Sequence, residues 1–298
     1  MTPAISVTGL TRRYRGQLAL DSVTFDAEAG VITGLLGRNG AGKTTLMRII
    51  AGQEFASAGD VRVFGASPAE NDPILRRMVF VREDQAYPDF KVRHALQTAS
   101  WFYPDWSDEL ADSLLADFDL PASRPVKKLS RGMRSALGIV IGLAARAELT
   151  MFDEPYAGLD VVARQVFYDW LLADYAACPR TVLLSTHLID ETAGLLERVM
   201  VMARGRIVLE AAADDLRGAA TRVSGPVLAV DEFRAGHPVW DSRRMGSQAS
   251  AVIVGPLAEA DRALARTGHL TLEPLSLQQL VVHAAGPPAP GTLERTSR

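Results

Sequence analysis

Residues 37–45 read GRNGAGKTT, a glycine-rich loop that ends in a lysine and two threonines. Glycines let a chain turn with its N–H groups pointing inward, and the positive end of a following helix adds to the attraction for anions. In loops of this pattern the lysine reaches the β- and γ-phosphates of a nucleotide, and the threonine that follows it can ligate Mg²⁺. We therefore expect a nucleotide-phosphate site rather than a structural turn, formed by Gly37, Arg38, Asn39, Gly40, Ala41, Gly42, Lys43, Thr44 and Thr45.

Three later segments carry further polar groups. An apolar run over 149–152 ends in Asp153 and Glu154, and a residue in this place at a strand tip is expected to hold Mg²⁺ while its neighbour polarises an attacking water. The sequence LSRGM at 129–133 precedes a helical run, and His187 ends another strand, where an imidazole could contact a γ-phosphate. The plainer alternatives are a surface acid for Glu154 and a buried strand-end histidine for His187.

Together these segments resemble the ATP-binding-cassette (ABC) ATPase family, over about residues 4–210. The resemblance rests on Walker A at 37–45, the signature at 129–133, Walker B at 149–154, a D-loop at 157–160 and the switch histidine His187, which follow the family order. It implies catalytic roles for Glu154, His187 and Lys43, and metal ligation by Thr44 and Asp153. ATP and Mg²⁺ are the ligands that it implies.

The family also implies contacts to the nucleotide outside the phosphate loop. Tyr14 would stack on adenine, although a surface aromatic at a strand end is the alternative. In the family, ATP is sandwiched between two cassettes, so Ser130, the backbone at Gly132 and the D-loop Asp160 would act on nucleotide at the interface with a second cassette. Ser130 also fits the simpler role of a helix cap, and the two roles are compatible.

Two positions depart from the family pattern. The usual signature LSGGQ is here LSRGM, and Arg131 either strengthens nucleotide capping or lies in solvent. Glu83 stands where the Q-loop glutamine is usual, and as a carboxylate it would add a metal ligand near Mg²⁺. Gln85 could replace that glutamine only if the loop shifts.

Composition excludes several classes of protein. The net charge of −3 gives no sign of nucleic-acid binding, and the single cysteine, Cys178, excludes an intrachain disulfide. The longest apolar stretch, residues 136–145, is half of the roughly 20 residues that a membrane span needs. We therefore expect that the chain does not cross a membrane by itself, and the family resemblance implies a peripheral protein held at the cytoplasmic face of the cell membrane by a permease.

The pattern of apolar runs predicts an α/β fold with strands and helices in alternation and a largely parallel central sheet. For residues 1–212 the family implies a P-loop (RecA-like) ABC nucleotide-binding domain, with an N-terminal antiparallel β subdomain and an inserted helical subdomain over about 84–145. Helices are expected over 161–175 and 189–197, and a hairpin is expected to turn near Arg204 and Gly205.

Residues 213–285 predict a small C-terminal α+β domain. Apolar runs at 227–230, 251–254 and 269–272 are typical of strands, and 257–266 of a helix. The proline-rich tail 286–298 is expected to be disordered.

The leading hypothesis is an ATP-hydrolysing subunit of an ABC transporter, most similar to single-cassette exporters. Its partners would be a second cassette, identical or different, and a separately encoded permease that docks between the Q-loop and the helical subdomain. A soluble ABC ATPase acting as a regulatory, nucleic-acid or ribosome-associated switch is the alternative. Only about 45 residues separate Glu83 from Leu129, too few for a long coiled-coil arm.

Overall fold

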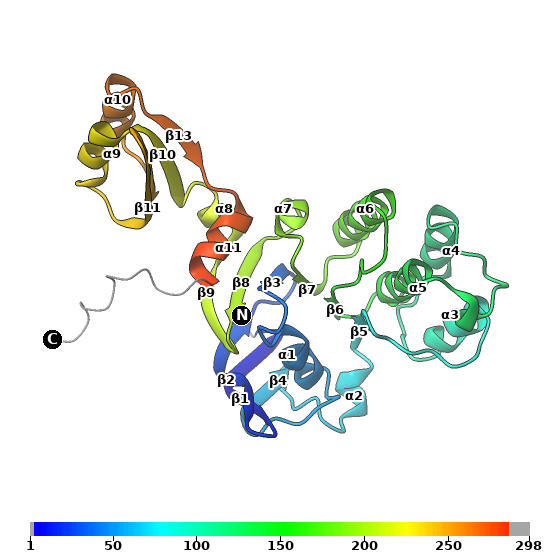
Figure 1. Cartoon of the computed structure of the whole chain (residues 1–298). Helices are drawn as coiled ribbons and strands as arrows, with labels where there is room; N and C mark the ends of the chain where they lie inside the picture. Colours follow the sequence, from blue (N-terminus) through cyan, green and yellow to red (C-terminus); the bar gives the residue numbers. More distant parts are fainter. Residues whose placement is uncertain (1–2, 286–298) are drawn as a thin grey trace. The chain divides into compact units, whose positions relative to one another are not determined.

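The computed structural model of the protein describes residues 3–285, so the tail expected to be disordered lies outside the described residues. The chain forms two compact units (Figure 1). Among the described residues, the first unit contains 3–188 and 194–210, and the second contains 189–193 and 211–285. The sequence placed a boundary after residue 212 but gave no sign that 189–193 belongs with the C-terminal unit.

A six-stranded sheet forms the centre of the first unit. Its strands follow the order β5 (Met78–Arg82), β6 (Leu149–Asp153), β7 (Thr181–Thr186), β3 (Ile32–Leu36), β8 (Arg198–Ala203) and β9 (Arg206–Ala212). The strand pairings from β5 through β8 are all parallel, which confirms the predicted sheet. Strands β3, β6 and β7 are buried along their whole length, as expected for a sheet covered on both faces.

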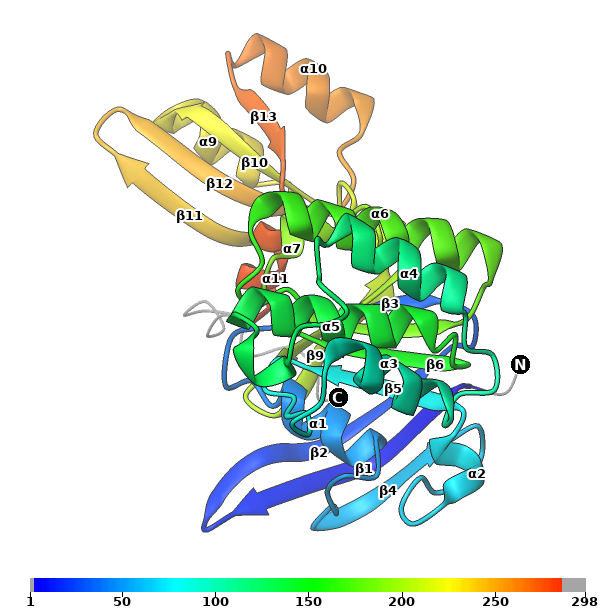
Figure 2. The ribbon, with the colours of Figure 1, turned by 90° about the vertical axis from the view of Figure 1, so that its right-hand side faces the viewer.

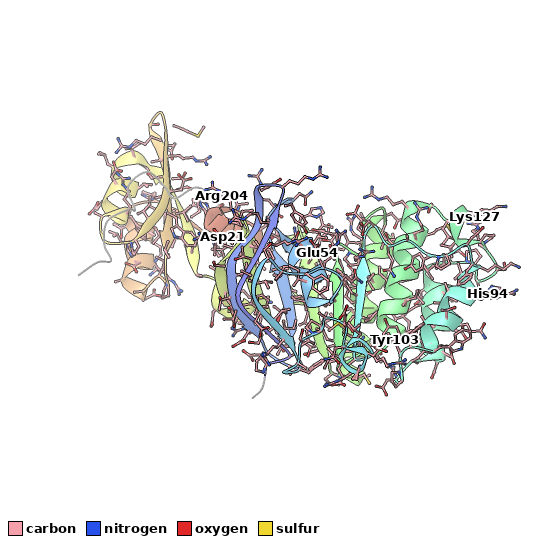
Figure 3. The ribbon with its side chains drawn as sticks, turned by 90° about the horizontal axis from the view of Figure 1, so that it is seen from below. Asp21, Glu54, His94, Tyr103, Lys127 and Arg204 are labelled. Carbon is pink, nitrogen blue, oxygen red and sulfur yellow. The ribbon has the colours of Figure 1, made fainter. Side chains whose placement is uncertain are left out.

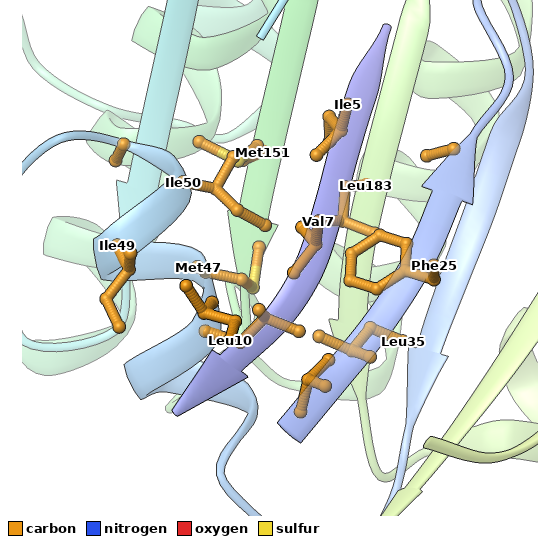
Figure 4. Close-up of a cluster of buried hydrophobic side chains, with 14 of the residues drawn as sticks. Ile5, Val7, Leu10, Phe25, Leu35, Met47, Ile49, Ile50, Met151 and Leu183 are labelled. Atoms are coloured by element: carbon orange, nitrogen blue, oxygen red, sulfur yellow. The ribbon is translucent and has the colours of Figure 1, made fainter. Parts of the chain in front are cut away.

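A second sheet in this unit is antiparallel and three-stranded, in the order β2 (Gln17–Ala27), β1 (Ile5–Tyr14) and β4 (Ala58–Val63). Its inner face packs with helix α1 (Lys43–Ile50) and the central sheet in one hydrophobic core (Figure 4). Ile5 and Val7 from β1 meet Met47 and Ile50 from α1 in this core. The core therefore fixes the start of α1, which follows the phosphate loop, against two sheets.

The helices of the first unit cover the central sheet and form the inserted segment (Figure 2). Their bounds are α1 Lys43–Ile50, α2 Asp72–Leu75, α3 Val92–Ser100, α4 Asp108–Asp117, the 3₁₀ helix η1 Val126–Lys128, α5 Arg131–Ala144 and α6 Val161–Ala177. Helix α5 packs on β5 and β6 and also contacts α4. The helices expected over the inserted segment are thus present, and α5 links them to the strand that ends in Asp153.

The second unit holds a four-stranded antiparallel sheet in the order β11, β12, β10 and β13. Val230 and Phe233 of helix α9 pack against this sheet in a separate core. The elements of the unit are α7 Ile189–Thr192, α8 Ala213–Leu216, β10 Ala220–Pro226, α9 Val227–Arg234, β11 Val239–Met245, β12 Gln248–Val254, α10 Glu259–Thr267, β13 Thr271–Pro274 and α11 Leu277–Ala285.

Two predicted elements differ from the structure. The apolar run 227–230 was expected to be a strand, but it opens helix α9. Burial at Val230 and Phe233, with Leu228 exposed, follows the three-residue spacing of a helix and not the alternation of a strand. The helix expected over 189–197 is limited to the four residues of α7. Gly194, which lies just beyond it, is unfavourable within a helix.

Candidate nucleotide site

The loop between β3 and α1 borders a cavity of about 510 Å³. Residues 39–45 of the phosphate loop line it, and so do Glu83 and Glu154. A cavity of this size is within the range of small-molecule sites. The structure therefore gathers the phosphate loop, the Q-loop position and the second acid of Walker B around one space.

Two glycines in the loop are required by close backbone approaches. A Cβ atom on Gly37 would lie 2.3 Å from the carbonyl oxygen of Met202, and one on Gly42 would lie 2.6 Å from that of Ala19. Gly42 also has a φ of +111°, which side-chain-bearing residues rarely adopt. The neighbouring strands thus leave no room for a side chain where the loop turns into α1.

Lys43 directly follows Gly42, the last glycine of the loop, and is 6% exposed. Its Nζ donates to the carbonyl oxygen of Gly37 at 2.7 Å and lies 3.4 Å from Oε1 of Glu154. An ammonium group has three donors. Lys43 is therefore held across the loop, close to the acid at the end of β6.

Asp153 ends β6 and is buried. Burial raises the pKa of this carboxyl, and the hydroxyls of Thr44 and Ser185 act in the opposite direction. Its Oδ1 has no hydrogen-bond partner among the described residues. A buried carboxylate oxygen that lacks a donor, beside a threonine hydroxyl, is a donor set that suits a hard divalent cation.

Glu154 has a φ of +49°, a conformation that is uncommon for residues other than glycine. Its N–H donates to the carbonyl oxygen of Ser185 at 3.2 Å, which ties the turn to the end of β7. Oε2 of Glu154 lies 2.6 Å from Nδ1 of His187, whose side chain is 52% exposed. The strand-end turn thus brings together the two residues predicted to act on the γ-phosphate.

Tyr156 is a site residue that the sequence did not single out. It is 3% exposed, and its hydroxyl donates to Oε2 of Glu154 at 2.8 Å. The same hydroxyl contacts Oγ1 of Thr186. The only signal in the sequence was a tyrosine two residues after the predicted base. Whether its side chain points toward that base depends on the register of β6 and β7, which the sequence did not give.

The signature and the D-loop lie against each other. Ser130 caps α5 by accepting a hydrogen bond from the N–H of Met133 at 3.2 Å, and Asp160 caps α6 by accepting one from Ala163 at 2.8 Å. A Cβ atom on Gly132 would lie 2.4 Å from the carbonyl oxygen of Gly158. Ser130 and Asp160 are exposed, so their predicted contacts to nucleotide at a second cassette remain sterically open.

The two departures from the family pattern meet in the structure. Arg131 of the signature donates from Nη2 to Oε1 of Glu83 in the Q-loop, with both side chains largely exposed. Glu83 also lines the cavity. Its metal-binding role remains a prediction, and in the described conformation its carboxylate pairs with a guanidinium.

Tyr14 ends β1 and is not among the residues that line the cavity. Its hydroxyl donates to Oε1 of Glu54, and the guanidinium of Arg12 lies 4.6 Å from the centre of its ring. Arg12 also donates to Glu54 at 2.8 Å. Since these contacts hold the ring in this conformation, adenine stacking by Tyr14 remains a prediction.

Two further segments complete the wall of the cavity, and one of them is the predicted hairpin turn. They are residues 17–19 of β2 and the turn between β8 and β9 at Arg204 and Gly205. Both turn residues have positive φ, which suits a two-residue hairpin turn. Gly205 accepts a hydrogen bond from the N–H of Asp21 at 2.9 Å, and Figure 3 shows Arg204 beside Asp21.

A second cavity of about 680 Å³ follows the Q-loop. Residues 83–89 line one side, and Val126, Lys127, Arg131 and Arg134 line the other. This is the region where the sequence placed the docking groove for a permease. Tyr87 lies in the wall, whereas Phe90 and Trp101 are exposed. The groove exists, and its occupant remains a prediction.

Within residues 3–285, no helix combines the length and the apolar character that a membrane crossing requires. The residues predicted from the sequence to bind metal and nucleotide lie at strand ends, at helix starts and in loops of the first unit.

Comparison with known proteins agrees with this arrangement. The family model described as ABC transporter matches residues 20–157. The Nod factor export ATP-binding protein I of Ralstonia nicotianae is 32% identical over 216 residues, which cover 70% of this chain and 67% of that protein. The daunorubicin/doxorubicin resistance ATP-binding protein DrrA of Streptomyces peucetius is 33% identical over 226 residues, covering 72% and 67%. A dimeric bacterial ABC transporter cassette shares the fold, with a TM-score of 0.61 at 20% identity over 70% of this chain and 98% of the other.

Proposed function

The chain belongs to the ABC transporter family, and from that premise we propose that it hydrolyses ATP to drive a separate export permease. The observation that carries the hydrolytic part is the position of Glu154. Its carboxylate lines the phosphate-loop cavity, 3.4 Å from Lys43 and 2.6 Å from His187.

In the proposed reaction a water attacks the γ-phosphorus of ATP while Glu154 accepts a proton from it. The bond between the γ-phosphorus and the leaving oxygen breaks, which yields ADP and phosphate. Lys43 would neutralise charge on the β- and γ-phosphates, and His187 would contact the γ-phosphate. Positioning and charge stabilisation account for most catalysis of phosphoryl transfer.

We also propose that Thr44 and Asp153 hold Mg²⁺. The unpartnered Oδ1 of Asp153 and the nearby Thr44 hydroxyl support this assignment. When it is bound, the ion would neutralise charge on the phosphate oxygens. Glu83 would join these ligands only after leaving Arg131.

The complete site would form between two cassettes. Ser130 and Gly132 lie at the exposed start of α5, where a helix end and a hydroxyl can address a phosphate presented by another chain. Asp160 lies at the start of α6 beside this region. A solved cassette of the same fold is a dimer, which supports this proposal.

The export role rests on relatives. One is described as a Nod factor export protein and another as a drug resistance protein, and both are described as ATP-binding proteins. We infer that the groove along residues 83–89 receives a permease, which would hold the chain at the cytoplasmic face of the membrane. Neither of these relatives is described as acting on ribosomes or nucleic acid, so they do not favour the alternative of a ribosome- or nucleic-acid-associated switch.

The hydrolytic proposal is tested with Glu154→Gln. Steady-state ATP hydrolysis should fall by about 10²- to 10⁴-fold, because a positioned base contributes that much. ATP binding should remain, and a Mg²⁺- and ATP-dependent dimer should accumulate in light scattering. Glu148→Gln is the matched control, since Glu148 precedes the same strand at its other end and pairs with Arg77. Equal turnover in the two variants would refute the role of Glu154.

The permease proposal is tested separately. Tyr87→Ser should weaken co-purification with the permease from cells that express this chain, while leaving ATP binding by the isolated chain intact. Tyr103→Ser is the comparison, since Tyr103 lies in the same helical region but does not line the groove. Unchanged co-purification in the Tyr87 variant would remove the groove from the proposal.

A further inference from the structure

We propose that Tyr156 is a positioning residue that holds the carboxylate of Glu154 toward the attacking water. The inference rests on the proposed hydrolytic function. Tyr156 does not line the cavity, and its hydroxyl contacts the carboxylate of Glu154, the proposed base.

The contacts of Tyr156 are specific. Its hydroxyl lies 2.8 Å from Oε2 of Glu154 and also meets Oγ1 of Thr186, at the end of the neighbouring strand β7. Its ring lies edge-on to the imidazole of His187, with the ring centres 6.1 Å apart. Tyr156 therefore touches the base and lies beside the γ-phosphate sensor.

The direction of the hydrogen bonds follows from which groups can donate. A carboxylate only accepts, so the phenol donates to Glu154. The Thr186 hydroxyl then donates to the phenol oxygen, and it accepts from the N–H of Leu188 at 2.9 Å. Three donors in series thus end on Oε2 of Glu154. Burial and the nearby Glu154 both raise the pKa of Tyr156, so the phenol stays protonated at neutral pH.

The other two polar side chains beside the Glu154 carboxylate, Lys43 and His187, have competing roles. Lys43 lies in the phosphate loop and lines the cavity, and His187 is 52% exposed. Both are cations or potential cations that bound phosphates would attract. Tyr156 is buried and does not line the cavity, so ATP cannot draw it away. It is the donor that can keep Glu154 in place when the nucleotide is bound.

The test is Tyr156→Phe, which removes one oxygen and keeps the ring. We expect kcat for ATP hydrolysis to fall roughly 10-fold, a small part of the whole contribution of the base, because the carboxylate gains orientational freedom. KM for ATP should stay within about twofold, since no contact to nucleotide is lost.

Tyr175→Phe is the matched control. Its phenol also donates to a carboxylate, that of Glu197 at 2.6 Å, but neither residue lines the cavity. This variant should keep the kcat and the KM of the unmodified protein. Thr186→Val should reproduce part of the Tyr156→Phe effect, and Thr186→Ser, which retains the hydroxyl, should reverse it.

The outcomes separate this inference from the proposed function. If Glu154→Gln abolishes turnover while Tyr156→Phe leaves kcat unchanged, the positioning role is wrong and the function stands. If Glu154→Gln itself hydrolyses normally, the function fails first. A fall in kcat that comes with a lower melting temperature and a raised KM for ATP, in both Tyr156→Phe and Thr186→Val, would show a structural role and overturn the inference.

Discussion

Alanine at Arg131, at Glu83 and at both positions should reveal what their ion pair does. The two side chains are 64% and 42% exposed. Exposed pairs typically contribute about 0.2–1 kcal/mol, because water screens the charges and two long side chains lose freedom. For a unit of this size, 1 kcal/mol corresponds to about 2–4 °C in melting temperature. We therefore expect the double-mutant cycle to give a small coupling energy in thermal unfolding.

The ion pair should affect the Mg²⁺ dependence of ATP hydrolysis more than it affects thermal stability. Glu83 lines the nucleotide cavity, so its carboxylate is available to Mg²⁺ only when it leaves Arg131. Breaking a pair worth up to about 1 kcal/mol changes an equilibrium by up to about 5-fold. Arg131→Ala should thus lower the Mg²⁺ concentration that gives half-maximal ATP hydrolysis by at most about that factor. Glu83→Ala should raise it.

The assay is ATP hydrolysis titrated with Mg²⁺ at fixed ATP and at two ionic strengths. Salt weakens exposed pairs, so the effect of Arg131→Ala should shrink as salt is added. Lys127→Ala is the control, because Lys127 forms a comparably exposed pair with Asp89 in the same groove. If the Mg²⁺ requirement is the same in the Arg131, Glu83 and Lys127 variants, Glu83 takes no part in metal binding and its pairing is structural only.

Three further predictions concern the same site. Asp153→Asn should raise the melting temperature of the nucleotide-free protein at pH 7 and abolish stabilisation by Mg²⁺, because burial raises the pKa of Asp153 and its charge opposes folding. That cost is full above the raised native pKa and absent below the unfolded value near about 4, so the advantage of the variant should vanish in acid. Gly132→Ala should cost about 1–3 kcal/mol in denaturant unfolding, since its Cβ would lie 2.4 Å from a carbonyl oxygen, whereas Gly194→Ala meets nothing within 4 Å. His187→Ala should bind fluorescent ATP normally but hydrolyse ATP slowly, and unchanged turnover would exclude His187 from the reaction.

The sequence predicted features whose cause is local. The phosphate loop could be read because its glycines and lysine act within nine residues, and the strand before it is a continuous apolar run. Alternation of strands and helices predicted the parallel sheet for the same reason. The apolar run 227–230 was misassigned because four residues cannot distinguish two-residue from three-residue periodicity. The helix is determined by the packing of Val230 and Phe233 against the neighbouring sheet, which the sequence pattern alone does not reveal.

Local sequence patterns did not predict contacts between residues that are far apart in the chain. Tyr156 and Thr186 are 30 residues apart, and they meet because Asp153 pairs with Ser185 in the register of β6 and β7. Arg131 and Glu83 are 48 residues apart, on the signature and on the Q-loop. Both departures from the family pattern were visible in the sequence, but nothing in it indicated that they face each other.

The two pairs have a common physical consequence. In each, a carboxylate with a proposed role in the reaction is held by a group outside the phosphate loop: Glu154 by the buried Tyr156, and Glu83 by the exposed Arg131. The buried contact is shielded from water and should persist through the cycle, whereas the exposed contact costs little to break. The structure therefore predicts opposite salt dependence for two variants of one enzyme. The effect of Tyr156→Phe on kcat should be the same at low and high ionic strength, and the effect of Arg131→Ala on the Mg²⁺ requirement should disappear at high ionic strength.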